Sequence, residues 1–262
     1  VRDPQKGTGA LADAGVDTSR VEVRAVDLAD LASVRAFAYG VAADHERLDL
    51  LVANAGVMAC PQGTTADGFE TQFGTNHLGH FVLVNRLVPL LLAGAPSRVV
   101  MLSSGGHRMS DVDLDDPNFE QTPYDPWIGY GRSKTANILF AVELDRRLRD
   151  RGVRAAAVHP GVIQTELTRH MTDESLKTLL ERRGNRPMNR KTVEQGAATS
   201  VWAGVAADAD AVGGRYCEDC TVSEITEDPS SATGVCAYAL DPDRAAALWA
   251  RSEELVGETF AV

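Results

Sequence analysis

The sequence lacks an excess of positive charge and has no long apolar run. Its 262 residues include 26 lysines and arginines against 37 aspartates and glutamates, giving a net charge of −11. This balance argues against a nucleic-acid-binding face or a surface for anionic membranes. The best apolar candidate, Phe81 to Leu92, is interrupted by Asn85, Arg86 and Pro89, so it is too short to span a bilayer. We therefore expect neither nucleic acid nor membrane as a partner.

Cysteine is scarce, at four residues, and its arrangement does not complete a metal site. Cys217 and Cys220 form a C-x-x-C with Cys236 as the one further cysteine nearby, Cys60 is remote, and no histidine follows His170. A tetrahedral zinc site would need a fourth ligand, so we predict no metal. A few reduced thiols and no visible signal peptide are typical of a cytoplasmic protein.

The sequence does contain a regular alternation of short apolar runs and longer helical stretches. We predict strands at 21–26, 48–53, 98–102, 153–158 and 214–217, and helices at 29–46, 68–92, 128–150, 192–205 and after the cap Asp241. Apolar strands alternating with helices indicate a parallel sheet that is covered on both faces. The predicted fold is α/β, a doubly wound Rossmann-type sheet in a single domain spanning 1–262.

Polar residues, glycine and proline follow the predicted strands at their carboxyl ends. They are Asp27, Asn54, Ser103, Ser104, Pro160 and Gly161. Ligands of doubly wound sheets bind beyond this edge. The charged segment 166–190 leaves the same edge, and we predict that it is a substrate loop, with a plain surface loop as the alternative.

Tyr130 and Lys134 lie four residues apart on one face of the predicted helix 128–150. A tyrosine of ordinary pKa near 10 is a poor base at neutral pH. An ammonium about 4 Å away favours the phenolate by roughly 4 kcal/mol at an effective dielectric of 20, or about three pKa units, although desolvation opposes the shift. The spacing predicts an acid/base pair, and an incidental contact on an exposed helix is the alternative.

Ser104 and Asn76 are further candidates for the same site. The Ser104 hydroxyl could donate to a substrate oxygen, while the two glycines after it allow close approach, although a plain turn would use the same residues. The context is not the G-x-S-x-G of an α/β-hydrolase. Asn76 is a mediocre helix former inside a predicted helix, so it is either aimed into the site or simply exposed.

Several motifs occur together in a fixed order. They are Asn54-Ala55-Gly56, Asn76-His77-Leu78-Gly79-His80-Phe81, Ser103-Ser104, Tyr130-Gly131-Arg132-Ser133-Lys134, and His159-Pro160-Gly161 with Thr165. As a set they resemble the classical short-chain dehydrogenase/reductase family, and most closely its retinol-dehydrogenase-like branch. The likeness extends from Val1 to about Cys220.

The resemblance implies specific roles. Tyr130 would be the general acid/base, Lys134 would lower its pKa and hold the nicotinamide ribose, Ser104 would bind the reacting oxygen, and Asn76 would position a relay water. The implied cofactor contacts are Arg2, Asp27, Leu28, Asn54, Ala55, Gly56, Tyr130, Lys134, Pro160, Gly161, Ile163 and Thr165.

The sequence departs from the family at its front. No G-x-G-x-x-G phosphate loop is present, because Gly7 and Gly9 lie in the wrong context. Val1 to Pro4 look like the residues after the family's second strand, so we expect this sequence to lack the first strand–helix–strand unit, about 30 or more residues. The strand at 21–26 would then have no neighbour.

Arg2 bears on the choice of cofactor. The resemblance puts it beside an adenosine 2′-phosphate, and guanidinium geometry suits bidentate phosphate binding. NADP(H) is therefore favoured, while NAD(H) stays open because Asp3 beside Arg2 is ambiguous. A surface arginine at a loop start is the alternative.

The predicted function is an NADP(H)-dependent interconversion of an alcohol and a carbonyl, on a lipophilic small molecule. A catalytically silent nucleotide sensor on the same fold is the alternative, since fold alone does not separate the two. A nucleotide-sugar epimerase is disfavoured because the chain after Lys134 is short. The predicted helices 68–92 and 128–150 carry apolar residues on more than one stripe, which favours a homodimer or homotetramer.

Overall fold

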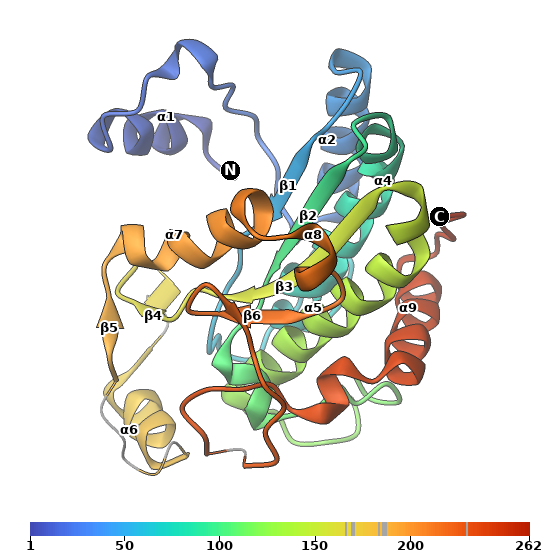
Figure 1. Ribbon diagram of the computed structural model, residues 1–262. Coiled ribbons are helices and arrows are strands. Elements are labelled where there is room, and N and C mark those ends of the chain that lie inside the picture. Colours follow the sequence, from blue (N-terminus) through green and yellow to red (C-terminus); the bar gives the residue numbers. More distant parts are fainter. Residues whose placement is uncertain (166, 169–170, 183, 185–187, 229) are drawn as a thin grey trace.

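The computed structural model describes residues 1–262 except 166, 169–170, 183, 185–187 and 229. A five-stranded sheet with the order β1-β2-β3-β6-β7 forms its centre (Figure 1). Its strands are β1 (Leu50–Ala53), β2 (Ser97–Leu102), β3 (Val153–His159), β6 (Tyr216–Glu218) and β7 (Thr221–Val222). The first four run parallel, and β7 pairs antiparallel with β6.

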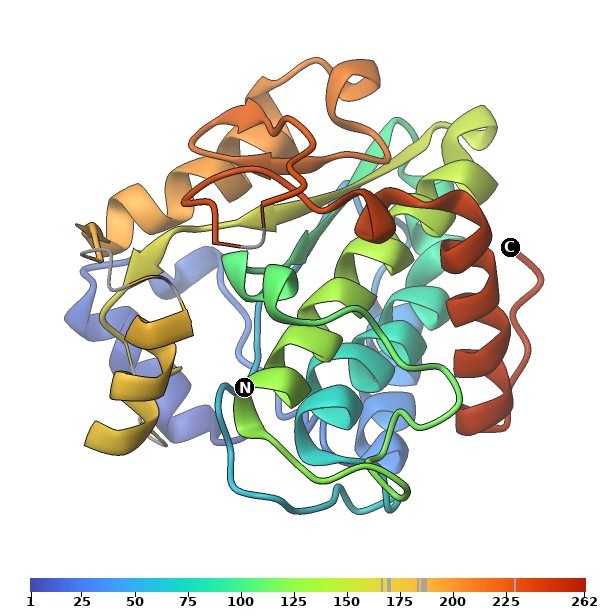
Figure 2. The ribbon, with the colours of Figure 1, turned by 90° about the horizontal axis from the view of Figure 1, so that it is seen from below.

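Helices cover both faces of this sheet (Figures 1 and 2). One face carries α2 (Leu31–Asp44), α4 (Gly79–Ala93), α5 (Pro126–Leu148) and, packed on α5, α9 (Pro242–Val256). The other face carries α7 (Val193–Val201), its π-helical extension η6 (Trp202–Ala206) and α8 (Ala209–Val212). The predicted doubly wound α/β architecture is confirmed.

Alternate residues of the central strands supply the two cores. Val99 and Met101 of β2 pack on the α4 and α5 side, whereas Val100 and Leu102 pack on the α7 side. A strand that is buried on both faces must be apolar at successive positions, which is why β2 reads as a continuous apolar run. The sheet is thereby held rigidly between two layers, and its carboxyl edge is fixed in place.

The predicted helix 68–92 forms in three parts: α3 (Thr71–Phe73), a π-helical turn η2 (Gly74–Leu78) and α4. It begins at Thr71 because the Glu70 carboxylate accepts hydrogen bonds from the amides of Gln72 and Phe73. The widened turn contains Asn76. π-Helical turns are frequent at functional sites.

The predicted strand 21–26 is wrong. This segment is irregular, and its strand-like hydrogen bonds go to one residue: the Val26 amide donates to the Val1 carbonyl (2.9 Å), and the Val1 amino group donates to Arg24 (3.1 Å). A strand needs a continuous ladder of partners. No strand lies beside this segment among the described residues, since β1 forms that edge of the sheet.

Two regions without a predicted element contain helices. α1 (Pro4–Asp13) is capped by Asp3 and buries none of its residues. α6 (Asp173–Arg182) lies in the predicted substrate segment 166–190, whose ends are joined by pairing of β4 (Val162–Ile163) with β5 (Arg190–Lys191). Of that segment, residues 166, 169–170, 183 and 185–187 lie outside the described residues. The short 3-10 helices are η1 (Thr18–Arg20), η3 (Gly105–Met109), η4 (Arg149–Arg151) and η7 (Ala237–Leu240).

The second apolar stripes of the two long helices are covered within the chain, by α2 on α4 and by α9 on α5. These helices therefore need no second subunit to cover them, and the homodimer or homotetramer stays a prediction. Among the helices of the described residues, none combines the length and apolar character needed to cross a bilayer.

Candidate active site

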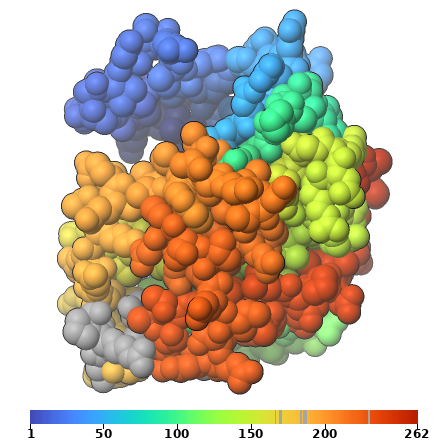
Figure 3. Space-filling view, viewed as in Figure 1, coloured from blue at the N-terminus to red at the C-terminus, as the bar shows by residue number. Residues whose placement is uncertain are grey.

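A cavity of about 1050 Å³ lies at the carboxyl ends of β1, β2 and β3. In Figure 3 the blue N-terminal segment stands apart from the orange α7 region across a hollow in the same part of the molecule. The predicted site residues that line the cavity are Arg2, Asn54, Ala55, Gly56, Ser104, Tyr130, Lys134, Pro160, Gly161, Ile163 and Thr165. The carboxyl edge thus brings together most of the predicted set.

Three predicted residues do not line this cavity: Asp27, Leu28 and Asn76. The Asp27 carboxylate accepts from the Ala29 amide, and Leu28 is buried. The cofactor contacts of Asp27 and Leu28 and the relay water of Asn76 stay predictions.

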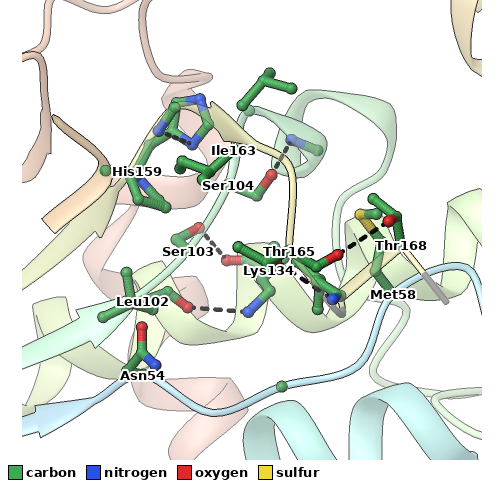
Figure 4. Close-up of a pocket in the computed structure, with 18 of the residues that line it drawn as sticks. Asn54, Met58, Leu102, Ser103, Ser104, Lys134, His159, Ile163, Thr165 and Thr168 are labelled. Atoms are coloured by element: carbon green, nitrogen blue, oxygen red, sulfur yellow. Dashed lines mark hydrogen bonds between the residues drawn. The ribbon is translucent and has the colours of Figure 1, made fainter. Parts of the chain in front are cut away.

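Helix α5 presents Tyr130 and Lys134 to the cavity, both almost fully buried. It starts two residues earlier than predicted, because Asp125 caps its first amides and Pro126 occupies its first position. The Lys134 Nζ lies 5.7 Å from the centre of the Tyr130 ring and donates to the Leu102 carbonyl at 3.1 Å (Figure 4). The predicted pair therefore shares one wall of the cavity.

Burial controls the charge of both groups. It raises the pKa of Tyr130 to about 12, against an opposing hydrogen bond from Ser104. It lowers the pKa of Lys134 to about 8. The net shift of the Tyr130 pKa is therefore upward, opposite to the sequence expectation, because desolvation is its largest cause. The Lys134 ammonium donates to the Leu102 main-chain carbonyl.

Ser104 lines the same cavity as Tyr130 and Lys134. Its Oγ accepts from the Gly106 amide at 3.0 Å, which leaves the hydroxyl proton free to be donated. Gly106 itself must lack a side chain, because a Cβ there would lie 2.8 Å from the Cδ1 and Cε1 atoms of Tyr130. The glycine after Ser104 thus allows the tyrosine ring to pack against the loop.

Neighbouring Ser103 forms a hydrogen bond to α5 that was not predicted from the sequence. Its Oγ donates to the Lys134 main-chain carbonyl at 2.8 Å and is buried (Figure 4). The bond fastens the end of β2 to α5 at the level of the lysine. The two serines therefore have different roles: the Ser103 hydroxyl joins β2 to α5, and Ser104 lines the cavity with a hydroxyl proton to donate.

Asn76 lies directly behind the cavity wall. Its Oδ1 accepts from the Val57 amide (2.8 Å), and its Nδ2 donates to the Val57 carbonyl (2.9 Å) and to Ser133 Oγ (2.9 Å). A Cβ on Gly56 would lie 2.9 Å from Asn76 Oδ1. Asn76 is thus not an exposed helical residue, since it holds the loop after β1 against α5.

Apolar side chains form a further part of the cavity wall, and only those of the segment 166–190 were expected near the site. Four of the chain's five methionines line it: Met58, Met109, Met171 and Met188. Trp127 and two leucines of α6, Leu176 and Leu179, add to this wall. No spacing rule reveals such residues, because they come from loops and short helices far apart in sequence.

Two contacts attach α6 to the start of α5. The Trp127 Nε1 donates to the Ser175 carbonyl at 3.1 Å. Arg182 forms an ion pair with Asp125, the cap of α5, with 2.7 Å between Nη2 and Oδ2. The helix that carries the leucines is therefore held over the end of the cavity next to Tyr130.

The arrangement can be compared with known proteins. The sequence pattern of the short chain dehydrogenase family matches residues 2–176. The chain belongs to this family. The short-chain dehydrogenase resemblance drawn from the motifs is confirmed, and the protein is an oxidoreductase of the short-chain type.

Relatives support the predicted branch. The chain is 42% identical to human retinol dehydrogenase 12 over 258 residues, which cover 98% of this chain and 77% of that protein. It is 43% identical to a "Probable oxidoreductase" of Streptomyces lividans over 255 residues, covering 95% and 84%. The short-chain dehydrogenase is thus placed in the retinol-dehydrogenase-like branch.

Solved structures show the same fold. A Mycobacterium paratuberculosis protein superposes with a TM-score of 0.73 at 37% identity, covering 100% of this chain and 84% of that one. An NADPH-bound carbonyl reductase from chicken fatty liver superposes with a TM-score of 0.58 at 20% identity, covering 84% of each chain.

Proposed function

We propose that the protein is an NADP(H)-dependent oxidoreductase that interconverts a carbonyl and an alcohol on a lipophilic small molecule. One observation carries the proposal: the Tyr130 phenol, the Ser104 hydroxyl and the Lys134 ammonium line one cavity, and Tyr130 lies there within an apolar cluster that includes Trp127. A catalytically silent nucleotide sensor would have no need for a buried acid/base group.

The chemistry of the chain's own residues favours carbonyl reduction at neutral pH. With its pKa raised to about 12, Tyr130 is a neutral phenol that can donate a proton to the carbonyl oxygen. Ser104 has a hydroxyl proton to donate to the same oxygen. Lys134, charged below its pKa of about 8, stabilises negative charge that develops on Tyr130.

The cavity fits a nicotinamide dinucleotide, which would supply or accept the hydride. The loop after β1 offers Asn54, Ala55 and Gly56, and a side chain at Gly56 would enter the space beside Asn76 and Lys134. Arg2 lines the cavity in a protein of net charge −11, which supports a 2′-phosphate and therefore NADP(H). The NADPH bound by the carbonyl reductase of similar fold agrees with this choice.

A lipophilic substrate is supported by the methionine wall, our name for the apolar part of the cavity lining formed by Met58, Met109, Met171, Met188, Trp127, Leu176 and Leu179. Methionine side chains are flexible and polarisable, so they adapt to apolar ligands of irregular shape. The retinol dehydrogenases among the relatives are named for such a substrate. The segment 166–190 contributes Met171 and Leu179 to this wall, which supports its predicted role as a substrate loop.

The decisive experiment is a screen of aldehydes, ketones and alcohols with NADPH and with NADH, with Tyr130→Phe as the matched control. We expect NADPH-dependent reduction of apolar carbonyls by the wild type. A wild type that binds NADPH but reduces none of them would support the silent sensor instead.

Two further predictions concern the whole protein. A homodimer or homotetramer is supported by the family likeness alone, and light scattering at micromolar concentration tests it.

A cytoplasmic location is supported by the free thiols of Cys217, Cys220 and Cys236, and fractionation of cells tests it.

A further inference from the structure

His107 lies in η3, the 3-10 helix that follows Ser104, and is fully buried. Its Nε2 accepts a hydrogen bond from the Cys236 amide at 3.2 Å, so this nitrogen carries no proton. The proton of the neutral ring is then on Nδ1, which lies 2.7 Å from the Ser104 carbonyl oxygen and donates to it. The two contacts therefore fix both the tautomer and the orientation of the ring.

His107 joins three segments at this point. Its carbonyl accepts from Thr135 Oγ1 (3.1 Å), which follows Lys134 on α5, and from Tyr238 OH (2.6 Å) in the C-terminal segment. Its own amide also donates to the Ser104 carbonyl at 3.1 Å. The Ser104 carbonyl thus accepts hydrogen bonds from two donors of His107, its main-chain amide and its ring Nδ1. His107 is in turn bound to α5 through Thr135 and to the C-terminal segment through Tyr238.

The His107 ring does not become charged near neutral pH, so both of its hydrogen bonds persist there. The ionisable groups that face the ring are Arg108 of η3, His159 of β3, Tyr216 of β6 and Cys236 of the C-terminal segment. Burial lowers the pKa of His107 to about 3, with a smaller contribution from Arg108. The ring stays neutral, and its role is one of geometry.

We propose that His107 is a positioning residue: its Nδ1–H holds the Ser104 carbonyl so that the Ser104 hydroxyl is directed at the Tyr130 phenol. The inference rests on the proposed function for its kinetic consequence. Its structural content is independent of turnover, because it concerns the placement of Ser104 relative to Tyr130.

A matched pair of variants separates the two bonds of the ring. The amide nitrogen in His107→Asn can replace Nδ1 as donor to Ser104 but does not reach Cys236. The longer side chain in His107→Gln can accept from Cys236 but places no donor at Nδ1. Both variants are assayed at least 10 °C below their measured unfolding temperatures, so that lost stability does not affect the rates.

We expect His107→Gln to lower kcat for carbonyl reduction at least tenfold with KM within twofold, and His107→Asn to keep kcat within threefold. Because the hydrogen bond from Ser104 lowers the pKa of Tyr130, the rise of alcohol oxidation with pH should also move to higher pH in His107→Gln alone. As a control, Tyr238→Phe removes only the C-terminal anchor and should lower the unfolding temperature while kcat stays within twofold.

Crystal structures of the two variants provide a readout that needs no turnover. Ser104 Oγ should lie within hydrogen-bonding distance of Tyr130 OH in His107→Asn and beyond it in His107→Gln. Equal kcat losses in both variants, or an unmoved Ser104 in His107→Gln, would overturn the inference. An inactive wild type with the expected Ser104 placements would instead reject the proposed reaction and leave His107 as the residue that positions Ser104.

Discussion

At the residue scale, burial is the largest influence on whether Tyr130 is a neutral phenol or a phenolate. A phenol with a pKa of about 12 is a ready proton donor and a poor base at pH 7. Sequence reasoning weighed an ammonium at an assumed distance and had no access to the depth of burial, so it expected the opposite direction of shift. The residues themselves were predictable, because Tyr130, Lys134 and Ser104 belong to short contiguous motifs.

Gly106→Ala tests how closely the tyrosine ring packs against the loop after β2. The added methyl group would lie 2.8 Å from two ring carbons of Tyr130, so the ring must move. Because small misplacements of reacting groups reduce rates strongly, we expect kcat to fall by about 10² with the Kd for NADPH within twofold.

The matched control for that change is Gly9→Ala on α1, where an added Cβ has no atom within 4 Å. It should leave kcat unaltered. A Gly106→Ala enzyme with the wild-type kcat would show that the ring has room to adapt.

At the scale of elements, hydrophobic periodicity predicted the long helices and the central strands. It failed for segments whose secondary structure depends on which other segment lies beside them. The strand at 21–26 has apolar and β-branched residues but no ladder beside it, so it stays irregular. The π-helical turn at Asn76 carries no sequence signal, and the methionine wall is assembled by loops. Motif residues were predictable; the apolar residues that surround them were not.

Arg182→Ala tests whether the attachment of α6 shapes the substrate site. The ion pair with Asp125 is partly exposed, and such pairs contribute up to about 1 kcal/mol. We expect KM for a bulky apolar carbonyl to rise up to about fivefold at low salt, with kcat nearly constant and a smaller effect at high salt. The measurement is KM at two ionic strengths.

Lys177→Ala is the control on the same helix, because Lys177 forms an ion pair with Glu181 of α6 itself, at 3.9 Å, and with no other residue among those that the structure describes. Its KM should match that of the wild type. Equal effects of the two variants would mean that the Arg182–Asp125 pair does not hold α6 in place.

At the scale of the whole molecule, three buried histidines make stability sensitive to acid. Burial lowers the pKa of His77 and His107 to about 3 and that of His80 to about 4. The unfolded chain binds these protons below about pH 6.5, whereas the native protein does not. Native stability is therefore complete above pH 6.5 and falls as the pH drops below it.

The size of this effect is large for a single domain. At pH 5.5 each histidine removes about 1.4 kcal/mol, so the three together remove about 4 kcal/mol of a total that is typically 5–15 kcal/mol. Urea unfolding between pH 5 and 8 measures the free energy of unfolding directly. A value that does not change from pH 7 to 5.5 would show that these rings are protonated in the native protein.

The central claim is that Tyr130 is the proton donor in an NADPH-dependent carbonyl reduction. The most direct test compares wild type and Tyr130→Phe in single-turnover reduction at pH 7, with the Kd for NADPH measured in parallel. The variant preserves the ring and removes the hydroxyl, so the rate should fall by about 10² or more while Kd stays within twofold. The rise of alcohol oxidation with pH should vanish in the variant, because it reports the phenolate of a group with a raised pKa. A Tyr130→Phe enzyme with the wild-type rate and the wild-type pH profile would contradict the mechanism.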